Sequence, residues 1–149
     1  MHFVIVGAGA LGSIYAGYLA RDGHQVSLVA RGDRARALTT HGISVTGQAS
    51  FTVNCDIVTQ PESLQHADVV IVATKTYDTE AALRPLRLEG VKCAFSVQNG
   101  VLKNEQLRTV FGQSATLGAV SMIGGQVLPA QGDLPGAVHY NMPGPTILG

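Results

Sequence analysis

The amino-acid sequence predicts an α/β fold with a doubly wound, mainly parallel sheet and an antiparallel C-terminal extension. Three observations predict it. The glycine-rich turn GAGALG, residues 7–12, joins a short apolar run to a segment of helical periodicity. The unbroken apolar runs at residues 67–73 and 91–97 are typical of strands that a parallel sheet buries on both faces. After residue 112, short strand-like runs follow one another without an intervening helix.

The composition excludes several classes of protein. The 149 residues suit one domain with a real core, since 46% are hydrophobic and only 13% are charged. Ten basic and ten acidic residues give zero net charge, so neither nucleic acid nor an anionic membrane surface is an expected partner. No apolar run approaches the roughly 20 residues of a membrane span. Because the first predicted strand begins at residue 2, no signal peptide is expected, and we expect a cytoplasmic protein.

The spacing of cysteines and histidines predicts no metal site. Cys55 and Cys93 match no metal or redox motif, so we expect two reduced, packed thiols. The five histidines are scattered along the chain, and no metal ligand set is expected among them.

The first 31 residues predict one strand–helix–strand unit. His2–Val6 is an apolar run that ends in the glycine turn, and Gln25–Ala30 is a second strand. The helix between them ends at Asp22-Gly23, where glycine can adopt the left-handed cap. One face of this helix carries a set of apolar side chains, namely Leu11, Ile14, Tyr15, Tyr18 and Leu19.

The glycine turn has the spacing Gly7-x-Gly9-x-x-Gly12 of a Rossmann-like dinucleotide site. In such a unit the first glycine makes the turn, the second admits a pyrophosphate to the backbone, and the third allows close packing of helix on strand. The helix N-terminus then presents free N–H groups to the phosphates. A turn without function is the alternative, but the flanking strands favour binding. We therefore expect cofactor contacts from Gly7, Ala8, Gly9, Ala10, Leu11 and Gly12.

Arg31 predicts which dinucleotide binds. NAD-binding units place an acid at the end of the second strand, where this chain has Arg31. A guanidinium suits a 2′-phosphate, which it can hold through two charged hydrogen bonds, so NADP(H) is the expected cofactor. Arg34 and Arg36 lie close by, and a solvated helix face is the alternative reading for them, favoured for Arg36.

The middle of the chain alternates helices and strands. Asp33–Thr40 is expected to be a helix capped by Asp33, followed by a hairpin around Gly47. Val101–Phe111 is a helix whose expected packing residues are Val101, Leu102, Leu107, Val110 and Phe111. The remaining expected elements are the hairpin strands Ile43–Thr46 and Phe51–Asn54, a helical turn at Pro61–Gln65, a strand at Ala67–Ala73, a helix at Thr79–Leu88 that Pro85 distorts or restarts, and a strand at Val91–Val97.

The C-terminal third predicts a β-meander. Ala115–Ile123, Gly136–Asn141 and Thr146–Leu148 are strand-like and are separated by glycine and proline. We expect them to extend the sheet, at least partly in antiparallel pairs.

Lys75 and Asn99 each follow a predicted parallel strand. Because the carboxyl ends of parallel strands meet at one edge, both are expected beside the glycine turn and Arg31. Lys75 is a compact cation placed for a nicotinamide ribose or a substrate carboxylate, and Asn99 offers both a donor and an acceptor. The alternatives are a surface lysine and an ordinary Asn-Gly turn.

These motifs together resemble a known family. GAGALGS, VAR, VATK and SVQNGV, in this order, are similar to the nucleotide-binding domain of ketopantoate reductase (2-dehydropantoate 2-reductase), and Gly136, Val138, His139 and the closing Ile147-Leu148-Gly149 match as well. The resemblance covers the whole chain. It implies NADPH-dependent reduction of 2-dehydropantoate, a small 2-oxoacid, in pantothenate biosynthesis. It implies that residues 7–12, Arg31, Lys75 and Asn99 contact NADPH, with Asn99 also near the substrate and the turn at residues 122–124 near the nicotinamide.

The resemblance also implies a part that this chain lacks. The family has a second, helical domain that carries the catalytic lysine, a glutamate and most substrate contacts, so no catalytic residue is expected in residues 1–149. We therefore expect a dinucleotide-binding domain that is a fragment of a two-domain reductase, inactive alone. A natural single-domain protein that senses nucleotides without catalysis is the alternative, and a homodimer is left open.

Overall fold

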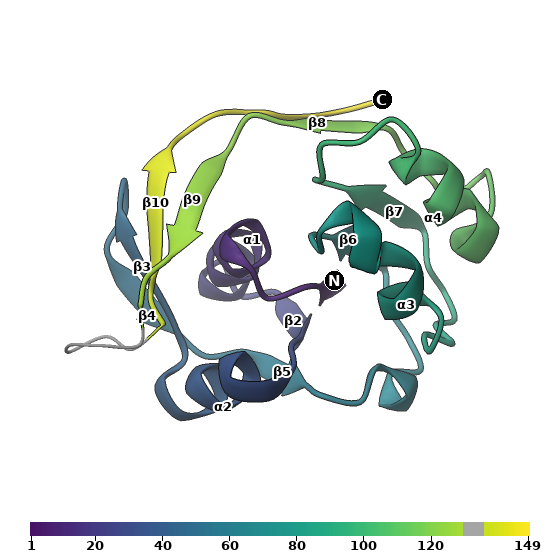
Figure 1. The fold of residues 1–149 in the computed structure, drawn as a ribbon. Coiled ribbons are helices and arrows are strands. Elements are labelled where there is room, and N and C mark those ends of the chain that lie inside the picture. The colour runs from purple at the N-terminus through teal and green to yellow at the C-terminus, as the bar shows by residue number, and fades with distance from the viewer. Residues whose placement is uncertain (130–135) are drawn as a thin grey trace.

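The computed structural model describes residues 1–129 and 136–149 and is drawn in Figure 1. Its central sheet has five parallel strands in the order β5-β2-β1-β6-β7. The order reverses between β1 and β6, which confirms the doubly wound α/β fold class. The bounds of these strands are β1 His2–Val6, β2 Gln25–Val29, β5 Asp56–Val58, β6 Val69–Val72 and β7 Cys93–Ser96.

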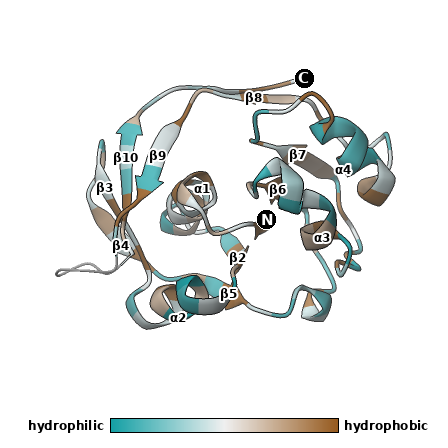
Figure 2. Ribbon diagram, in the orientation of Figure 1, coloured by the Kyte–Doolittle hydropathy of each residue, from teal (hydrophilic) through white to brown (hydrophobic). Residues whose placement is uncertain are grey.

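Helices cover both faces of the central sheet. Alternate side chains of β1 point to opposite faces, as strand geometry requires: Ile5 packs in one core cluster with Ile14, and Val4 packs in the other with Leu83 and Leu107. Figure 2 shows that α2 and α4 mix hydrophilic and hydrophobic residues, as helices with one buried face do. The bounds of the helices are α1 Ala10–Arg21, α2 Gly32–His41, α3 Thr79–Leu83 and α4 Lys103–Phe111, with 3₁₀ turns η1 Pro61–Ser63 and η2 Thr76–Asp78.

A second sheet covers the outer side of α1. It has the order β4-β3-β10-β9 and joins the predicted hairpin to strands from the end of the chain. Figure 1 shows α1 between this sheet and the central one. Gly17 of α1 faces the second sheet so closely that a Cβ there would lie 3.3 Å from the side chains of Ile43, Val45 and Phe51. The strand bounds are β3 Ile43–Gly47, β4 Phe51–Val53, β9 Gly124–Val127 and β10 Val138–Met142.

The C-terminal strands pair partly in antiparallel fashion as predicted, as β10 does with β9, but they do not extend the central sheet as a meander, so that detail of the prediction is wrong. Only Ala115–Leu117 meets β7: the Ala94 N–H donates to the Ala115 carbonyl at 2.7 Å, and the Leu117 N–H to the Ala94 carbonyl at 2.9 Å. β8 Ala119–Ser121 then pairs with β11 Thr146–Leu148 in an antiparallel ribbon. The physical reason is α1, which has apolar side chains on two sides and needs a second sheet to bury them.

Three local predictions also need correction. Asp33 does not cap α2, because Arg31 is the N-cap residue and no side-chain cap bond forms. The helix predicted for Thr79–Leu88 ends at Leu83, since Pro85 has no N–H to continue it. Of the packing residues predicted for α4, Leu107 is fully buried and Phe111 packs against the core, but Val101, Leu102 and Val110 are exposed. This helix begins at Lys103, so residues 103, 107 and 111 share its inner face.

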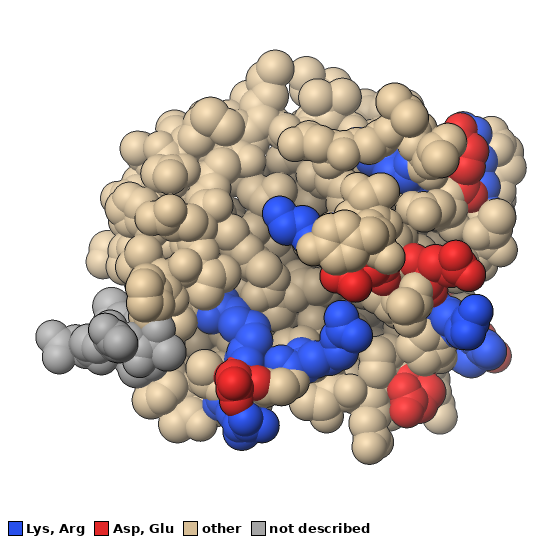
Figure 3. All heavy atoms as spheres, viewed as in Figure 1, with Lys and Arg blue, Asp and Glu red and all other residues tan. Residues whose placement is uncertain are grey.

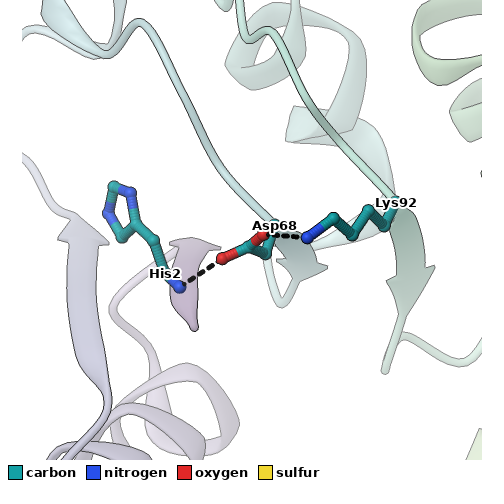
Figure 4. Close-up of polar contacts among 3 residues, drawn as sticks. All are labelled: His2, Asp68 and Lys92. Atoms are coloured by element: carbon teal, nitrogen blue, oxygen red, sulfur yellow. Dashed lines mark hydrogen bonds and ion pairs between the residues drawn. The ribbon is translucent and has the colours of Figure 1, made fainter.

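The amino ends of three strands are joined through one carboxylate, drawn in Figure 4. Asp68, just before β6, accepts a hydrogen bond from the backbone N–H of His2 at 2.8 Å. It also accepts one from the Lys92 ammonium at 2.7 Å. Lys92 and the His2 N–H together lower the pKa of Asp68 to about 2. The charged carboxylate thus connects the starts of β1, β6 and β7.

Candidate functional site

A groove crosses the carboxyl ends of the central strands. It consists of two adjoining pockets of about 340 Å³ and 310 Å³, which share Gly9, Ala73, Thr74 and Lys75. The first pocket is lined by Ala10, Leu11, Thr76, Val97, Gln98, Asn99, Ile123 and Gly125 in addition. The second is lined in addition by Val6, Gly7, Ala8, Val29, Ala30, Arg31, Arg34, Asp78 and Ala82. Apart from Gly12, every residue predicted for the site lines this groove.

The three glycines of the turn have different surroundings. Gly7 has φ +109°, and a Cβ on it would lie 2.8 Å from the Thr74 nitrogen. A Cβ on Gly12 would lie 1.8 Å from the Gly7 carbonyl oxygen, so Gly12 is required by packing beneath the groove. Gly9 is different, because a Cβ there would meet nothing within 4 Å. The fold itself does not require glycine at position 9, because the space beside its backbone is open.

The N-terminus of α1 faces the same space. Gly9 is its N-cap residue, no side chain caps it, and its first turn contains no acid. The first backbone N–H groups of a helix have no partner within it. These N–H groups and the positive end of the helix dipole therefore form a site suited to an anion beside Gly9.

Arg31 and Arg34 have different roles. Arg31 is exposed and lines the second pocket directly after β2. Arg34 holds the glycine turn in place. Its Nε donates to the Ala8 carbonyl at 2.9 Å, and its Nη2 donates to the Ser13 hydroxyl at 2.9 Å. Its Nη1 donates to the Gly136 carbonyl. The alternative interpretation, that Arg34 only belongs to a solvated helix face, is therefore wrong. The same interpretation is confirmed for Arg36, which forms an ion pair with Asp33 at the surface. Figure 3 shows basic side chains gathered over α2 on this face.

Lys75 and Asn99 line the first pocket from neighbouring loops. Lys75 follows β6 and Asn99 follows β7, and both are exposed. Ile123, from the turn at residues 122–124, lines the same pocket. The structure thus places the Asn99 amide and the apolar Ile123 at one end of the groove, Arg31 at the other end, and the Lys75 cation where the two pockets meet.

Gln98 was not singled out by the sequence analysis, although it is the most connected side chain of the groove. It is 7% exposed. The two hydrogens of its amide nitrogen are shared among three acceptors, which are the Thr74 carbonyl at 2.6 Å, the Thr74 hydroxyl at 3.0 Å and the Thr79 hydroxyl at 2.7 Å. Its amide oxygen accepts from the Ser96 hydroxyl at 3.0 Å. The sequence feature that could have indicated Gln98 is its position as a polar residue directly after an unbroken apolar run and just before Asn99.

Lys103 was also missed. Its ammonium donates to the carbonyls of Gln98 at 2.9 Å and Ser96 at 3.2 Å, and to that of Ala119. Burial lowers the pKa of this lysine. Because Ser96 and Gln98 lie at the end of β7 and Ala119 lies at the start of β8, Lys103 joins these two strand ends.

The described residues offer few other reactive groups. Burial and the neighbouring Asp56 raise the pKa of Cys55 to about 11, and burial raises the pKa of Cys93, so both free thiols stay protonated at neutral pH. The described part of the chain holds no group of three or more His, Cys, Asp or Glu side chains arranged for a metal ion. Within residues 1–129 and 136–149, no helix combines the length and hydrophobicity that crossing a bilayer requires.

The sequence is similar to known reductases over its whole length. The family model described as ketopantoate reductase PanE/ApbA matches residues 3–149. The 2-dehydropantoate 2-reductase of Pyrococcus abyssi is 33% identical over 152 aligned residues, which cover 100% of this chain and 47% of that protein. The chain thus spans about half the length of the curated relatives it matches.

Solved structures show the same fold. The crystal structure of 2-dehydropantoate 2-reductase from Geobacter metallireducens is 34% identical, with a TM-score of 0.85 over 100% of this chain and 49% of that one. A D-mandelate dehydrogenase in a ternary structure with NADH and anilino(oxo)acetate has a TM-score of 0.83 over 99% of this chain and 47% of its own. At 20% identity, that neighbour shows the fold alone. With a family model that matches almost every residue and a relative at 33% identity, the chain belongs to the ketopantoate reductase PanE/ApbA family.

Proposed function

We propose that this chain is the NADPH-binding domain of a 2-oxoacid reductase, whose substrate is 2-dehydropantoate and whose product is pantoate, in pantothenate biosynthesis. The observation that carries the proposal is the open space at Gly9 in a groove that runs from Arg31 to Asn99. Such a groove suits a dinucleotide, which has an anionic centre and two different ends. Family membership supports the substrate.

In this proposal the glycine turn and the N-terminus of α1 hold the pyrophosphate. Arg31 holds the 2′-phosphate that distinguishes NADPH from NADH. The D-mandelate dehydrogenase neighbour was solved with NADH, so the shared fold does not by itself select the phosphorylated cofactor. The support for NADPH is Arg31 itself, an exposed guanidinium in the second pocket where NAD-binding units have an acid.

Asn99 acts at the other end of the groove, and Lys75 acts where the two pockets meet. The bound cofactor supplies the hydride that reduces the 2-oxo carbon. Lys75 attracts the substrate carboxylate and the ribose hydroxyls, and Asn99 orients cofactor and substrate through its donor and acceptor. A nucleotide sensor would need the phosphate-binding residues but not this second pair. The presence of both side chains in one pocket therefore favours the reductase.

The rest of the activity is assigned to a second, helical domain. The relatives are about twice as long as this chain, which is consistent with such a domain. We place the catalytic lysine and glutamate there, along with most substrate contacts, as the resemblance to the family implies. A cytoplasmic enzyme is part of the same proposal.

Titration of the chain with NADPH, by calorimetry or by nicotinamide fluorescence, tests the proposal. We expect saturable binding, weakened about tenfold by Lys75→Met through loss of a charged hydrogen bond. Lys92→Met is the matched control, because that lysine pairs with Asp68 at the opposite edge of the sheet. Absence of NADPH binding, or equal effects of the two lysine changes, would contradict the proposed site.

A further inference from the structure

Gln98 connects the two loops that carry Lys75 and Asn99. The loop after β6 holds Lys75 and the loop after β7 holds Asn99, so both side chains reach the groove from irregular backbone. The loops lie against one another, since a Cβ on Gly100 would be 3.5 Å from the Thr76 hydroxyl. The relative position of the two loops therefore depends on the hydrogen bonds that connect them.

The Gln98 amide makes this connection. The Thr74 carbonyl can only accept, so the amide group that faces it at 2.6 Å must be the nitrogen. The same nitrogen donates to the Thr79 hydroxyl at 2.7 Å, and Thr79 in turn donates to the Lys75 carbonyl at 3.3 Å. The carbonyls of both Thr74 and Lys75 are therefore connected to the residue that precedes Asn99.

The other side of Gln98 is held as firmly. Its amide oxygen accepts from Ser96, its backbone N–H donates to the same hydroxyl at 3.2 Å, and its carbonyl accepts from Lys103. Gln98 and Thr79 are 7% and 1% exposed. Hydrogen bonds so well shielded from water do not exchange readily with solvent, which makes the link stiff.

We propose that Gln98 is a positioning residue that sets the spacing between Lys75 and Asn99, so that both engage the nicotinamide half of the dinucleotide together. The inference rests on the proposed function. Among the described residues, the Gln98 side chain makes its hydrogen bonds to Ser96, Thr74 and Thr79 and none to Gly9 or Arg31, which are proposed to hold the pyrophosphate and the 2′-phosphate. Its loss therefore weakens one half of the binding groove and leaves the other intact.

Two ligands separate these halves: NADPH, and 2′-phospho-ADP-ribose, which lacks the nicotinamide. Gln98→Met keeps the length of the side chain but removes its donors. We expect NADPH affinity to fall about threefold to tenfold, the equivalent of one to two hydrogen bonds, and affinity for 2′-phospho-ADP-ribose to stay within about twofold. In combination with Asn99→Ala, the two losses in NADPH affinity are expected to be less than additive, because Gln98 acts through Asn99.

Two further variants complete the design. Thr79→Val removes the hydroxyl that joins Gln98 to Lys75, and we expect the same selective loss of NADPH affinity. This variant also tests the inference if Gln98→Met does not fold. Ser44→Ala is the matched control: Ser44 is 6% exposed and bonds Thr52 at 2.9 Å between β3 and β4, so its loss affects stability and neither affinity.

The outcomes distinguish this inference from the function on which it rests. A wild-type chain that binds neither ligand overturns the proposed function and the inference with it. A wild-type chain that binds NADPH more tightly than 2′-phospho-ADP-ribose, with variants that lose both affinities equally or neither, overturns the positioning role alone. Selective loss of NADPH affinity in Gln98→Met or Thr79→Val supports it.

Discussion

Arg31 is the residue that we expect to distinguish the two nicotinamide dinucleotides. A charged hydrogen bond to the 2′-phosphate contributes roughly 1.5–3 kcal/mol, about tenfold to a hundredfold in affinity. Arg31→Ala should therefore reduce NADPH affinity to that of NADH, as measured by parallel titrations. Arg36→Ala, which removes an exposed guanidinium from α2, the helix that Arg31 precedes, is the control and should change neither affinity. Equal wild-type affinities for both cofactors would remove Arg31 from the site.

Gly9 and Gly12 should respond to substitution in opposite ways. Gly9→Val places a side chain in the open space where the pyrophosphate is proposed, so we expect loss of the NADPH-dependent rise in Tm, with a decrease of only about 2–4 °C in the unliganded Tm for a weaker helix cap. Gly12→Ala places a Cβ 1.8 Å from the Gly7 oxygen and should destabilise the fold itself, by about 1–3 kcal/mol or more. A Gly9→Val chain that keeps the full NADPH response would refute the steric argument.

Residues of the site were predictable where one local rule determines their role. The spacing of the glycines and the positions of Arg31, Lys75 and Asn99 after strands all follow from strand–helix–strand geometry, and the structure brings them to one groove. Gln98, Lys103 and Arg34 were not predictable in this way. Their roles depend on carbonyls supplied by distant segments, such as Gly136 for Arg34 and Ala119 for Lys103, and no local pattern encodes those contacts.

The junction of β1, β6 and β7 at Asp68 predicts a specific dependence of stability on pH. The folded-state pKa of about 2 lies below the unfolded value of about 3.9, so the charged carboxylate stabilises the fold above pH 4 and that contribution is lost as the pH falls toward 2. Asp68→Asn should therefore lower the Tm most above pH 4, and the difference from wild type should shrink toward pH 2. Thermal melts across this range measure it.

Lys92→Met is the control for that prediction. It removes the ion pair but leaves the hydrogen bond from the His2 N–H, so its effect should have the same pH dependence and a smaller size. A difference between wild type and Asp68→Asn that is constant from pH 2 to pH 7 would show that the carboxylate charge is not responsible.

Secondary structure was predictable for elements with a strong pattern and a defined start. The five strands of the central sheet were all indicated by apolar runs except β5, which is only three residues long. The errors in α3 and α4 both concern a helix boundary: Pro85 ends α3 early, and the start of α4 decides which of its residues face inward. Since α4 begins at Lys103 and not at Val101, the first two apolar residues lie outside the helix and are exposed.

For the whole molecule, we expect residues 1–149 to bind NADPH but not to reduce 2-dehydropantoate at a useful rate. The alkoxide that forms on hydride transfer needs a proton donor, and general acid catalysis contributes about 10²–10⁴-fold. Lys75 is assigned to binding, so that donor is expected from the second domain. The absorbance of reduced nicotinamide in a mixture of chain, NADPH and 2-dehydropantoate measures the rate. Turnover like that of a two-domain relative would make Lys75 the proton donor.

The overall fold class was predictable, but the second sheet was not. Alternating strands and helices require a parallel sheet, and the glycine turn indicates its switch point. The strand-like runs after residue 112 carry no information on which edge they join. The partner of β10 outside this region, β3, lies far away in the sequence. The sheet that they form covers the outer side of α1, which would otherwise be exposed.

The parallel pairing of β10 with β3 has a consequence for how the chain acquires its structure. The Thr46 hydroxyl and the His139 ring share a hydrogen bond across 93 positions of sequence. As the chain is synthesised, the first strand–helix–strand unit emerges early, yet the sheet over α1 stays incomplete until β10 has followed. Loop closure over such separations slows folding. The glycine turn therefore appears first in the nascent chain, and the sheet that encloses the helix behind it is completed late.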